Sequence, residues 1–249
     1  MSVGRVRSRP SGRHYLRSRS LAEQLVLDAG VAPGDLVLDL GAGRGVITRA
    51  LRDRGARVVA VELDAHVLGD LRRLGVEVVR ADARTVQLPR EPFRVVANLP
   101  FAAGTAILRR LLDDPRLPLL SSDVIVEWGL ATKRAAVWPS TLTSVYWGAW
   151  YALTVARRVP RACFAPPPSV DAAVLRAARR AEPLVPVREA RDYRAFLQRS
   201  FGDKRVPQAH TFATQLGFDP HARGRDLDAR QWAALYRSQT VRVMKRGRS

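Results

Sequence analysis

Cysteine and histidine are scarce in this chain of 249 residues. The single cysteine, Cys163, excludes an intramolecular disulfide framework and any metal site that needs several thiolates. The four histidines (His14, His66, His210 and His221) are scattered and show no metal-ligand spacing. We therefore expect no metal site, and we interpret Cys163 as a small buried residue rather than a nucleophile.

Long hydrophobic runs are also missing. No apolar segment reaches the ~18 residues that a membrane-spanning helix needs, and the N-terminus lacks the apolar core of a secretory signal. The hydrophobic content of 47% is nevertheless ample for a packed core. These features predict a soluble, cytoplasmic protein without membrane contact.

Acidic residues and lysine are few. The 42 basic residues outnumber the 23 acidic ones, which gives a net charge of +19; three of the 42 are Lys (Lys133, Lys204 and Lys245), so the other 39 are Arg. Such an excess predicts a polyanionic partner. Arg also binds phosphate and stacks on bases better than Lys does. A solvated basic surface without a partner is the alternative.

The chain divides into three segments by composition. Residues 1–20 hold six Arg and no acid, and we interpret them as a basic N-terminal arm that contacts nucleic acid. Residues 21–180 alternate apolar strands with helices, which predicts an α/β domain. Residues 181–249 begin at a Pro-marked linker and predict a small helical RNA-binding domain with a basic tail. Its expected helices span 189–201, 210–216 and 228–236.

Two local predictions concern elements of the α/β domain. Ser20 followed by Glu23 matches a capping box, which predicts a helix from Leu21 to Ala29. Residues 141–161 are rich in Trp, Tyr and Val, and we expect them to add strands to the sheet.

A glycine-rich turn follows the first predicted strand, residues 35–40. The turn is Gly41-Ala-Gly-Arg-Gly45, and a helix is expected after it. Such turns let the backbone lie against a ligand, but they serve nucleotides, flavins and nicotinamides alike. The spacing differs from the Gly-x-Gly-x-x-Gly of dinucleotide sites. Asp39 would repel a pyrophosphate, whereas it can accept from an ammonium group, directly or through water.

Acidic residues also end the next two predicted strands. Glu62 lies where a doubly wound site needs an acid for ribose hydroxyls; capping of the next helix is the alternative, although Asp64 suits that position better. Asp82 can accept from the amino group of an adenine ring. With Asp39, these acids face an amine, a ribose and an adenine, a set that describes S-adenosylmethionine better than a nicotinamide cofactor.

The tetrapeptide Asn98-Leu-Pro-Phe101 ends the fourth predicted strand. The Asn98 side-chain oxygen and the Leu99 backbone carbonyl can both accept from an exocyclic amine. Pro100 stiffens the loop, and Phe101 offers a flat face for stacking. A Pro-containing turn with an aromatic side chain that returns to the core is the alternative.

A second aromatic residue precedes a run of prolines. The segment Phe164-Ala-Pro-Pro-Pro-Ser-Val170 is typical of an extended loop, and it would present Phe164 rigidly to a ligand. Packing of the ring in the core is the alternative.

These motifs together resemble the ribosomal RNA adenine N6-methyltransferases, and most closely their Erm (macrolide-resistance) branch. The matching pieces are Asp39-Leu-Gly-Ala-Gly-Arg-Gly45, Glu62, Asp82, Asn98-Leu-Pro-Phe101 and Phe164-Ala-Pro-Pro-Pro-Ser-Val170. The resemblance implies an α/β fold, with a Rossmann-like class I methyltransferase sheet and a small C-terminal helical domain. It implies S-adenosylmethionine as donor and an adenine of protein-free or precursor 23S rRNA as target, with macrolide-type antibiotic resistance as the result. A monomer is expected.

Carried over residue by residue, the resemblance assigns two groups of site residues. The catalytic group is Asn98, Leu99, Pro100, Phe101 and Phe164, of which Asn98, Phe101 and Phe164 would hold the target base. The cofactor-binding group is His14, Leu16, Asp39, Gly41, Gly43, Glu62, Asp82, Ala83 and Asn98.

Two departures from related patterns bear on this interpretation. The family usually has Gly-Gln-Asn/His-Phe-Leu near the N-terminus, whereas this chain has Gly12-Arg-His-Tyr-Leu16, so Arg13 leaves the detail of methionine binding open. KsgA-type enzymes carry an Arg-Lys-Thr-Leu-like run in the tail, whereas this chain has Arg205-Val-Pro-Gln-Ala-His210, which favours Erm. A KsgA-type 16S rRNA adenine dimethyltransferase, a DNA adenine methyltransferase and a non-catalytic nucleic-acid-binding relative stay as alternatives.

Overall fold

The computed structural model describes residues 14–201, 217–219 and 221–246. Most of the expected basic arm, the expected helix 210–216 and the run 205–210 lie outside the described residues. Within the described part, none of the helices combines the length and the apolar character needed to cross a membrane.

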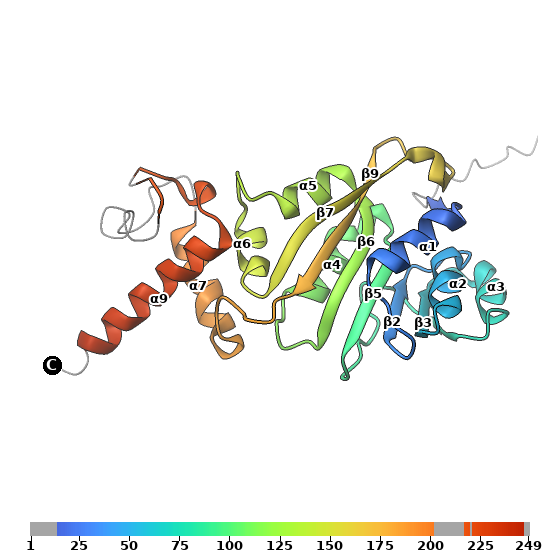
Figure 1. The fold of residues 1–249 in the computed structure, drawn as a ribbon, viewed down its shortest axis with the longest axis horizontal. Helices are drawn as coiled ribbons and strands as arrows, with labels where there is room; N and C mark the ends of the chain where they lie inside the picture. Colours follow the sequence, from blue (N-terminus) through green and yellow to red (C-terminus); the bar gives the residue numbers. More distant parts are fainter. Residues whose placement is uncertain (1–13, 202–216, 220, 247–249) are drawn as a thin grey trace, which may run out of the picture.

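A seven-stranded sheet forms the centre of the described chain, in the order β4-β3-β2-β5-β6-β9-β7 (Figure 1). The strands are β2 (Leu36–Leu40), β3 (Arg57–Glu62), β4 (Glu77–Arg80), β5 (Phe93–Asn98), β6 (Leu119–Glu127), β7 (Tyr151–Val159) and β9 (Ala172–Arg179). Strands β2 to β6 are parallel, and β9 lies antiparallel between β6 and β7. The chain moves outward from β2 to β4 and then returns to the other side of β2 at β5. Open α/β sheets bind their ligands at such a reversal, beyond the carboxyl ends of the strands.

Helices cover both faces of this sheet. α1 (Arg19–Asp28) and α2 (Val46–Asp53) pack on one face, and α4 (Gly104–Leu112) packs on the other. Alternate residues of a strand therefore enter different cores: Val96 of β5 packs on the α1–α2 side, and its neighbours Val95 and Ala97 pack on the α4 side. Burial of both faces explains why these strands are continuous apolar runs in the sequence.

The C-terminal helices lie at the end of the molecule opposite α2 and α3 (Leu68–Arg72) (Figure 1). Here α6 (Leu142–Gly148), α7 (Ala190–Ser200) and α9 (Ala229–Arg246) meet. Seven buried aromatic side chains fill the space between them: Tyr146, Trp147, Trp150, Tyr193, Phe196, Trp232 and Tyr236. These rings belong to the same apolar cluster as the α4 side of the sheet, so the C-terminal helices are packed onto the sheet through a continuous core.

Two local predictions are wrong in detail, and two are confirmed. α1 begins at Arg19, because Ser18 rather than Ser20 is the N-cap and accepts a hydrogen bond from the Leu21 N–H at 3.2 Å. Part of segment 141–161 is helical, because Thr141 and Ser144 form a capping box that starts α6; the strand β7 begins after it. The helices expected over 189–201 and 228–236 are present as α7 and α9, but α9 continues ten residues beyond the expected end, to Arg246.

Candidate active site

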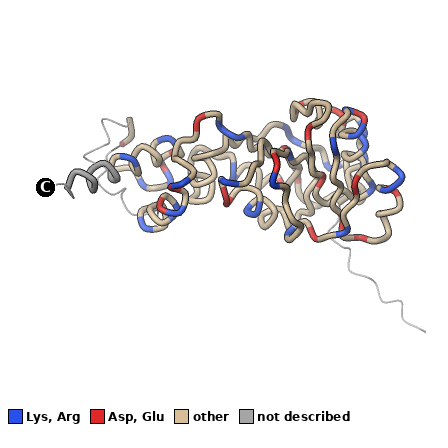
Figure 2. The backbone as a smooth tube through the Cα atoms, turned by 90° about the horizontal axis from the view of Figure 1, so that it is seen from below, with Lys and Arg blue, Asp and Glu red and all other residues tan. Residues whose placement is uncertain are grey.

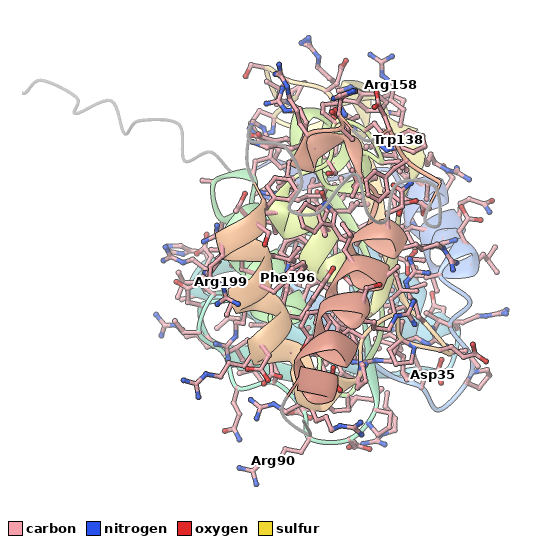
Figure 3. The ribbon with its side chains drawn as sticks, turned by 90° about the vertical axis from the view of Figure 1, so that its left-hand side faces the viewer. Asp35, Arg90, Trp138, Arg158, Phe196 and Arg199 are labelled. Carbon is pink, nitrogen blue, oxygen red and sulfur yellow. The ribbon has the colours of Figure 1, made fainter. Side chains whose placement is uncertain are left out.

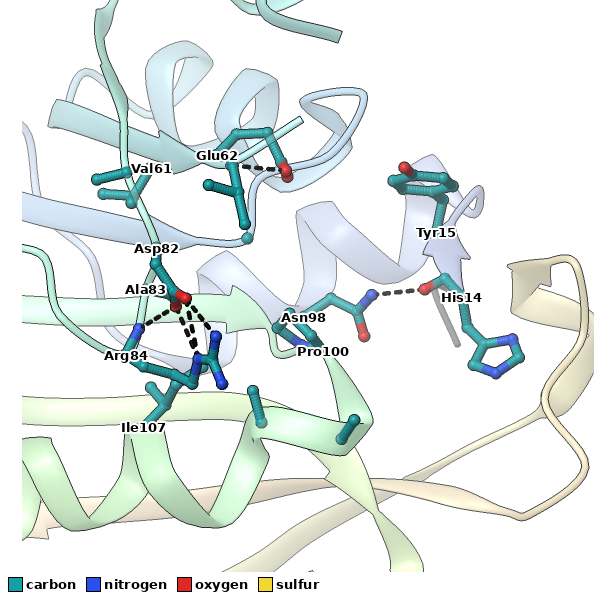
Figure 4. Close-up of a pocket in the computed structure, with 15 residues that line it drawn as sticks. His14, Tyr15, Val61, Glu62, Asp82, Ala83, Arg84, Asn98, Pro100 and Ile107 are labelled. Carbon is teal, nitrogen blue, oxygen red and sulfur yellow. Dashed lines mark hydrogen bonds and ion pairs between the residues drawn. The ribbon is translucent and has the colours of Figure 1, made fainter. Parts of the chain in front are cut away.

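A pocket of about 310 Å³ opens where β2, β3, β4 and β5 end (Figure 4). Its walls come from these strand ends, from the segment before α1 and from α4: His14, Tyr15, Gly41, Val61, Glu62, Leu63, Ala81, Asp82, Ala83, Arg84, Asn98, Pro100, Ala102, Ala103 and Ile107. Six of the nine residues expected to bind a cofactor are in this wall: His14, Gly41, Glu62, Asp82, Ala83 and Asn98. The reversal of strand order between β2 and β5 brings them together.

Glu62 is a buried carboxylate held by backbone amides at the end of β3. Its Oε2 accepts from the Gly43 N–H at 2.8 Å, and its Oε1 accepts from the N–H groups of Leu63 and Asp64, both at 2.8 Å. A carboxylate has about four acceptor sites, so one remains for a ligand. Asp64, not Glu62, caps the next helix by accepting from the His66 N–H at 3.0 Å.

Asp82 is another acid of the pocket wall, and it is paired with Arg84 (Figure 4). The Arg84 Nη2 donates to Asp82 Oδ2 at 2.6 Å, and the Arg84 backbone N–H donates to Oδ1 at 2.8 Å. This guanidinium holds the pKa of the Asp82 carboxyl below its ordinary value. Asp82 is therefore ionised at neutral pH, and a ligand amine that binds it competes with Arg84.

Two glycines of the turn after β2 allow Pro100 and Tyr15 to lie close to the backbone of the turn. Gly41 has a φ of 77°, and a Cβ there would lie 3.0 Å from Cδ of Pro100. Gly43 has a φ of 55°, and a Cβ there would lie 2.6 Å from Cδ1 of Tyr15. Side chains rarely adopt this left-handed conformation, and here they would also push apart the segments that form the pocket wall.

Three expected cofactor residues lie outside the main pocket. Leu16, Asp39 and Gly43 line a separate cavity of about 20 Å³, which shares Tyr15, Gly41 and Asn98 with the main pocket. The two spaces meet at the residues that end β2 and β5, so the three residues lie beside the pocket.

Asp39 is a buried acid in this smaller cavity. It is 1% exposed, and its Oδ2 accepts from Thr48 Oγ1 at 2.6 Å. Burial raises the pKa of Asp39 to about 7, against the lowering effect of the hydrogen bonds from Thr48. A nearby cation would favour the ionised form.

Asn98 ends β5 with its amide oriented by the backbone. Its Nδ2 donates to the carbonyl oxygen of His14 at 2.8 Å (Figure 4). The acceptor oxygen of the amide, Oδ1, is therefore on the side away from His14. Oδ1 is buried and has no hydrogen-bond partner among the described residues. An unsatisfied buried acceptor is costly, and a donor supplied by a ligand would satisfy it. The next residue, Leu99, is anchored by its N–H, which donates to the Ile125 carbonyl at 3.1 Å.

Three aromatic rings follow one another beside Asn98. The Phe101 ring centroid lies 5.5 Å from that of His14 and 6.1 Å from that of Phe164, with Phe101 and Phe164 edge to face. Phe164 is 1% exposed. The expectation that the proline run presents Phe164 to a ligand is therefore wrong for this structure, in which Phe164 supports Phe101 from the core.

The pairing of two short strands explains the burial of Phe164. β1 (Tyr15–Leu16) and β8 (Phe164–Ala165) form an antiparallel ladder that places Leu16 opposite Phe164. The His14 Nδ1 also donates to the Pro166 carbonyl at 2.9 Å. The proline loop thus closes over the segment before α1 and helps to hold His14 and Tyr15 at the pocket.

Sequence reasoning missed several residues of the pocket wall. Leu63 comes one residue after Glu62, and Arg84 comes two residues after Asp82. Their closeness in sequence to these strand-end acids is a signal that could have identified them. Ile107 comes from α4, and its direction depends on how that helix packs, so the sequence alone gave no signal for it.

Comparison with known proteins gives consistent matches. Residues 7–218 match the family described as ribosomal RNA adenine dimethylase. The mycinamicin-resistance protein MyrB of Micromonospora griseorubida is 34% identical over 242 residues, which cover 91% of this chain and 77% of that protein. An rRNA adenine N-6-methyltransferase of Bacillus licheniformis is 26% identical over 251 residues, which cover 94% of this chain and 88% of that protein.

A solved structure is also similar. The crystal structure of the 23S rRNA methyltransferase ErmE matches with a TM-score of 0.76 at 28% sequence identity. The match covers 90% of this chain and 98% of the ErmE chain.

Proposed function

Because the chain belongs to the ribosomal RNA adenine dimethylase family, we propose that it methylates N6 of an adenine in 23S rRNA and thereby confers macrolide-type resistance. The expected fold class, a Rossmann-like class I methyltransferase sheet with C-terminal helices, is confirmed. The observation that carries the proposal is Oδ1 of Asn98 at the edge of the pocket, which is buried and has no partner among the described residues. An amino group of a planar base is the donor that such an acceptor lacks.

We propose S-adenosylmethionine as the methyl donor, and the residues present fit it. When bound, it supplies a methyl group on a sulfonium that is a good leaving group. Glu62 keeps an acceptor site for a ribose hydroxyl, and Asp82 is an ionised acceptor for an adenine amine. Asp39 lies beside the pocket, where a cationic centre would favour its ionised form. Glycine at positions 41 and 43 leaves room for close backbone approach.

The target amine would be held by Asn98 and Leu99. Its two N–H groups would donate to Asn98 Oδ1 and to the Leu99 carbonyl, which directs the nitrogen lone pair toward the methyl group as charge develops. Pro100 keeps the loop rigid, and Phe101, supported by Phe164, would stack on the base. The base must leave its stack to reach this site, and stacking on Phe101 offsets part of that cost, at ~1–3 kcal/mol.

The charge of the protein supports a polyanionic substrate. Lys and Arg occur along the whole described backbone, with fewer Asp and Glu between them (Figure 2). We propose that the basic arm (1–20) and the C-terminal helical domain (181–249) add RNA contacts to those of the catalytic domain (21–180). The proposed substrate is protein-free or precursor 23S rRNA, and the proposed active form is a monomer.

Methyl transfer from labelled S-adenosylmethionine tests the proposal. Purified protein is incubated separately with protein-free 23S and 16S rRNA, and the modified base is mapped. Label on N6 of one adenine of 23S rRNA is the expected result. Label on 16S rRNA alone would move the chain to the small-subunit enzymes. Label on neither RNA, together with no binding of the cofactor in calorimetry, would contradict the proposed activity.

A further inference from the structure

Two exposed tryptophans lie in and just after α5 (Trp128–Ala135), the helix that follows β6. Trp128 is 38% exposed, and Trp138, three residues beyond the helix, is 62% exposed. The other three tryptophans (Trp147, Trp150 and Trp232) are fully buried. Single exposed apolar side chains are ordinary, whereas a contiguous exposed apolar patch indicates an interaction surface; Val137, next to Trp138, is also exposed.

The sheet register places Trp128 close to the site of methyl transfer. Asn98 of β5 pairs with Ile125 of the adjacent strand β6. Trp128 is three residues further along the chain, about 10 Å at the rise of a strand. Trp128 therefore lies beyond the same carboxyl edge of the sheet as the proposed base-holding loop.

Basic side chains accompany the two tryptophans. The Arg158 guanidinium lies over the Trp128 ring, 5.4 Å from its centroid. Arg158 and Arg161 share one carboxylate, that of Asp171, so the cluster keeps a net positive charge. Lys133, exposed on α5, adds another. Seen along the long axis of the molecule in Figure 3, Trp138 and Arg158 lie toward the same side.

A hollow continues this surface toward the C-terminal helices. It measures about 530 Å³ and is lined by Lys133 on α5, by Pro139 next to Trp138, and by Arg225 from the segment before α9. The exposed indoles and cations thus extend from the edge of the active site to the start of the C-terminal helices.

We propose that this tryptophan surface (Trp128, Lys133, Trp138, Arg158 and Arg161) binds the single-stranded RNA that flanks the target adenosine. Two bases stack on the indoles, and the cations bind the phosphates between them; the inference rests on the proposed function. The eight residues of α5 form a helix about 12 Å long, which spans about three to four nucleotides at ~3.4 Å each. A purely apolar patch would fit a protein partner, whereas alternating aromatic and basic side chains fit single-stranded nucleic acid.

Binding of an RNA hairpin with a single-stranded flank, measured by fluorescence anisotropy at several salt concentrations, tests the proposal. Trp138→Ala should weaken binding about tenfold and leave the slope of log Kd against log salt unchanged, because a stacked base carries no counterion. Trp138→Phe should restore binding to within about threefold, since it keeps a stacking face. Lys133→Gln should instead reduce the slope by about one.

The control variant is Leu120→Ala. Leu120 is 39% exposed at the opposite end of β6, so its loss removes exposed apolar surface away from the tryptophan surface. Equal RNA affinity of wild type, Trp138→Ala and Leu120→Ala would overturn the proposal. An equal loss in Trp138→Ala and Trp138→Phe would also overturn it, because stacking would not be the cause.

The binding assay requires no methyl transfer, so the two proposals fail separately. A wild-type protein that methylates 23S rRNA while Trp138→Ala binds and methylates normally would leave the activity intact and reject the tryptophan surface. A wild-type protein that transfers no methyl group to either rRNA would reject the activity. Loss of binding in Trp138→Ala would still support the tryptophan surface in that case.

Discussion

Asn98 Nδ2 donates a hydrogen bond to the carbonyl oxygen of His14 at 2.8 Å, between residues 84 positions apart. The bond ties the segment before α1 to the end of β5, and it uses the donor side of the amide. The acceptor side, Oδ1, is left buried without a described partner. One side chain thus closes the pocket wall and leaves an acceptor, to which we propose that the substrate amine donates.

Replacement of Gly43 tests whether the turn after β2 shapes the cofactor site. Gly43→Ala should cost about 1–2 kcal/mol of unfolding free energy for its positive φ. It should also weaken S-adenosylmethionine binding several-fold, because its Cβ would displace Tyr15, which lines both cavities. Gly30→Ala is the matched control, since Gly30 has a φ of 64° but no atom within 4 Å of an added Cβ.

The comparison is made by urea unfolding and by calorimetry with S-adenosylmethionine. Gly30→Ala should lose similar stability and keep full cofactor affinity. Unchanged affinity in Gly43→Ala would show that the contact with Tyr15 does not shape the site.

Asp39 should make stability depend on pH. Its pKa is about 7 in the folded protein, above its ordinary value of 3.8, so the folded state binds more protons than the unfolded state between these values. The free energy of unfolding should therefore fall as pH rises from about 4 to about 7. Asp39→Asn should remove this decrease. The free energy of unfolding of Asp39→Asn should therefore rise relative to that of wild type as pH increases across that interval. Parallel pH profiles of the two proteins in urea unfolding would contradict the assignment.

Arg84 should compete with the cofactor for Asp82. Arg84→Ala frees the carboxylate and should tighten S-adenosylmethionine binding a few-fold in calorimetry, whereas Asp82→Asn should weaken it about tenfold. Arg116→Ala is the control, because Arg116 pairs with Asp114 in the same i, i+2 arrangement outside the pocket wall. If Arg84→Ala weakened binding as much as Asp82→Asn, Arg84 would hold the cofactor instead of competing with it.

Sequence patterns predicted the parts of the fold that depend on local composition. The run 93–97 reads as a buried strand because both of its faces are covered, and the acids at strand ends meet because parallel strands end at one edge. Segment 142–148 was missed as a helix because it is short and mostly buried, so it shows no polar face.

The parts that failed depend on contacts between distant segments. The burial of Phe164 requires the pairing of β1 with β8 across most of the catalytic domain. The separation of Asp39 from the main pocket depends on how Tyr15 and Asn98 divide the space beyond β2. Such packing is set by the whole chain, and no local pattern records it.

The rate of methyl transfer by Asn98→Ala tests the central claim most directly. It is measured in a single turnover with saturating S-adenosylmethionine and 23S rRNA, alongside the affinity for RNA. Ser122→Ala is the control, because Ser122 Oγ is another buried atom without a described partner but lies outside the pocket wall. We predict a loss of about 100-fold or more in Asn98→Ala, with RNA affinity nearly unchanged and Ser122→Ala as active as wild type. Transfer by Asn98→Ala at the wild-type rate would contradict the account.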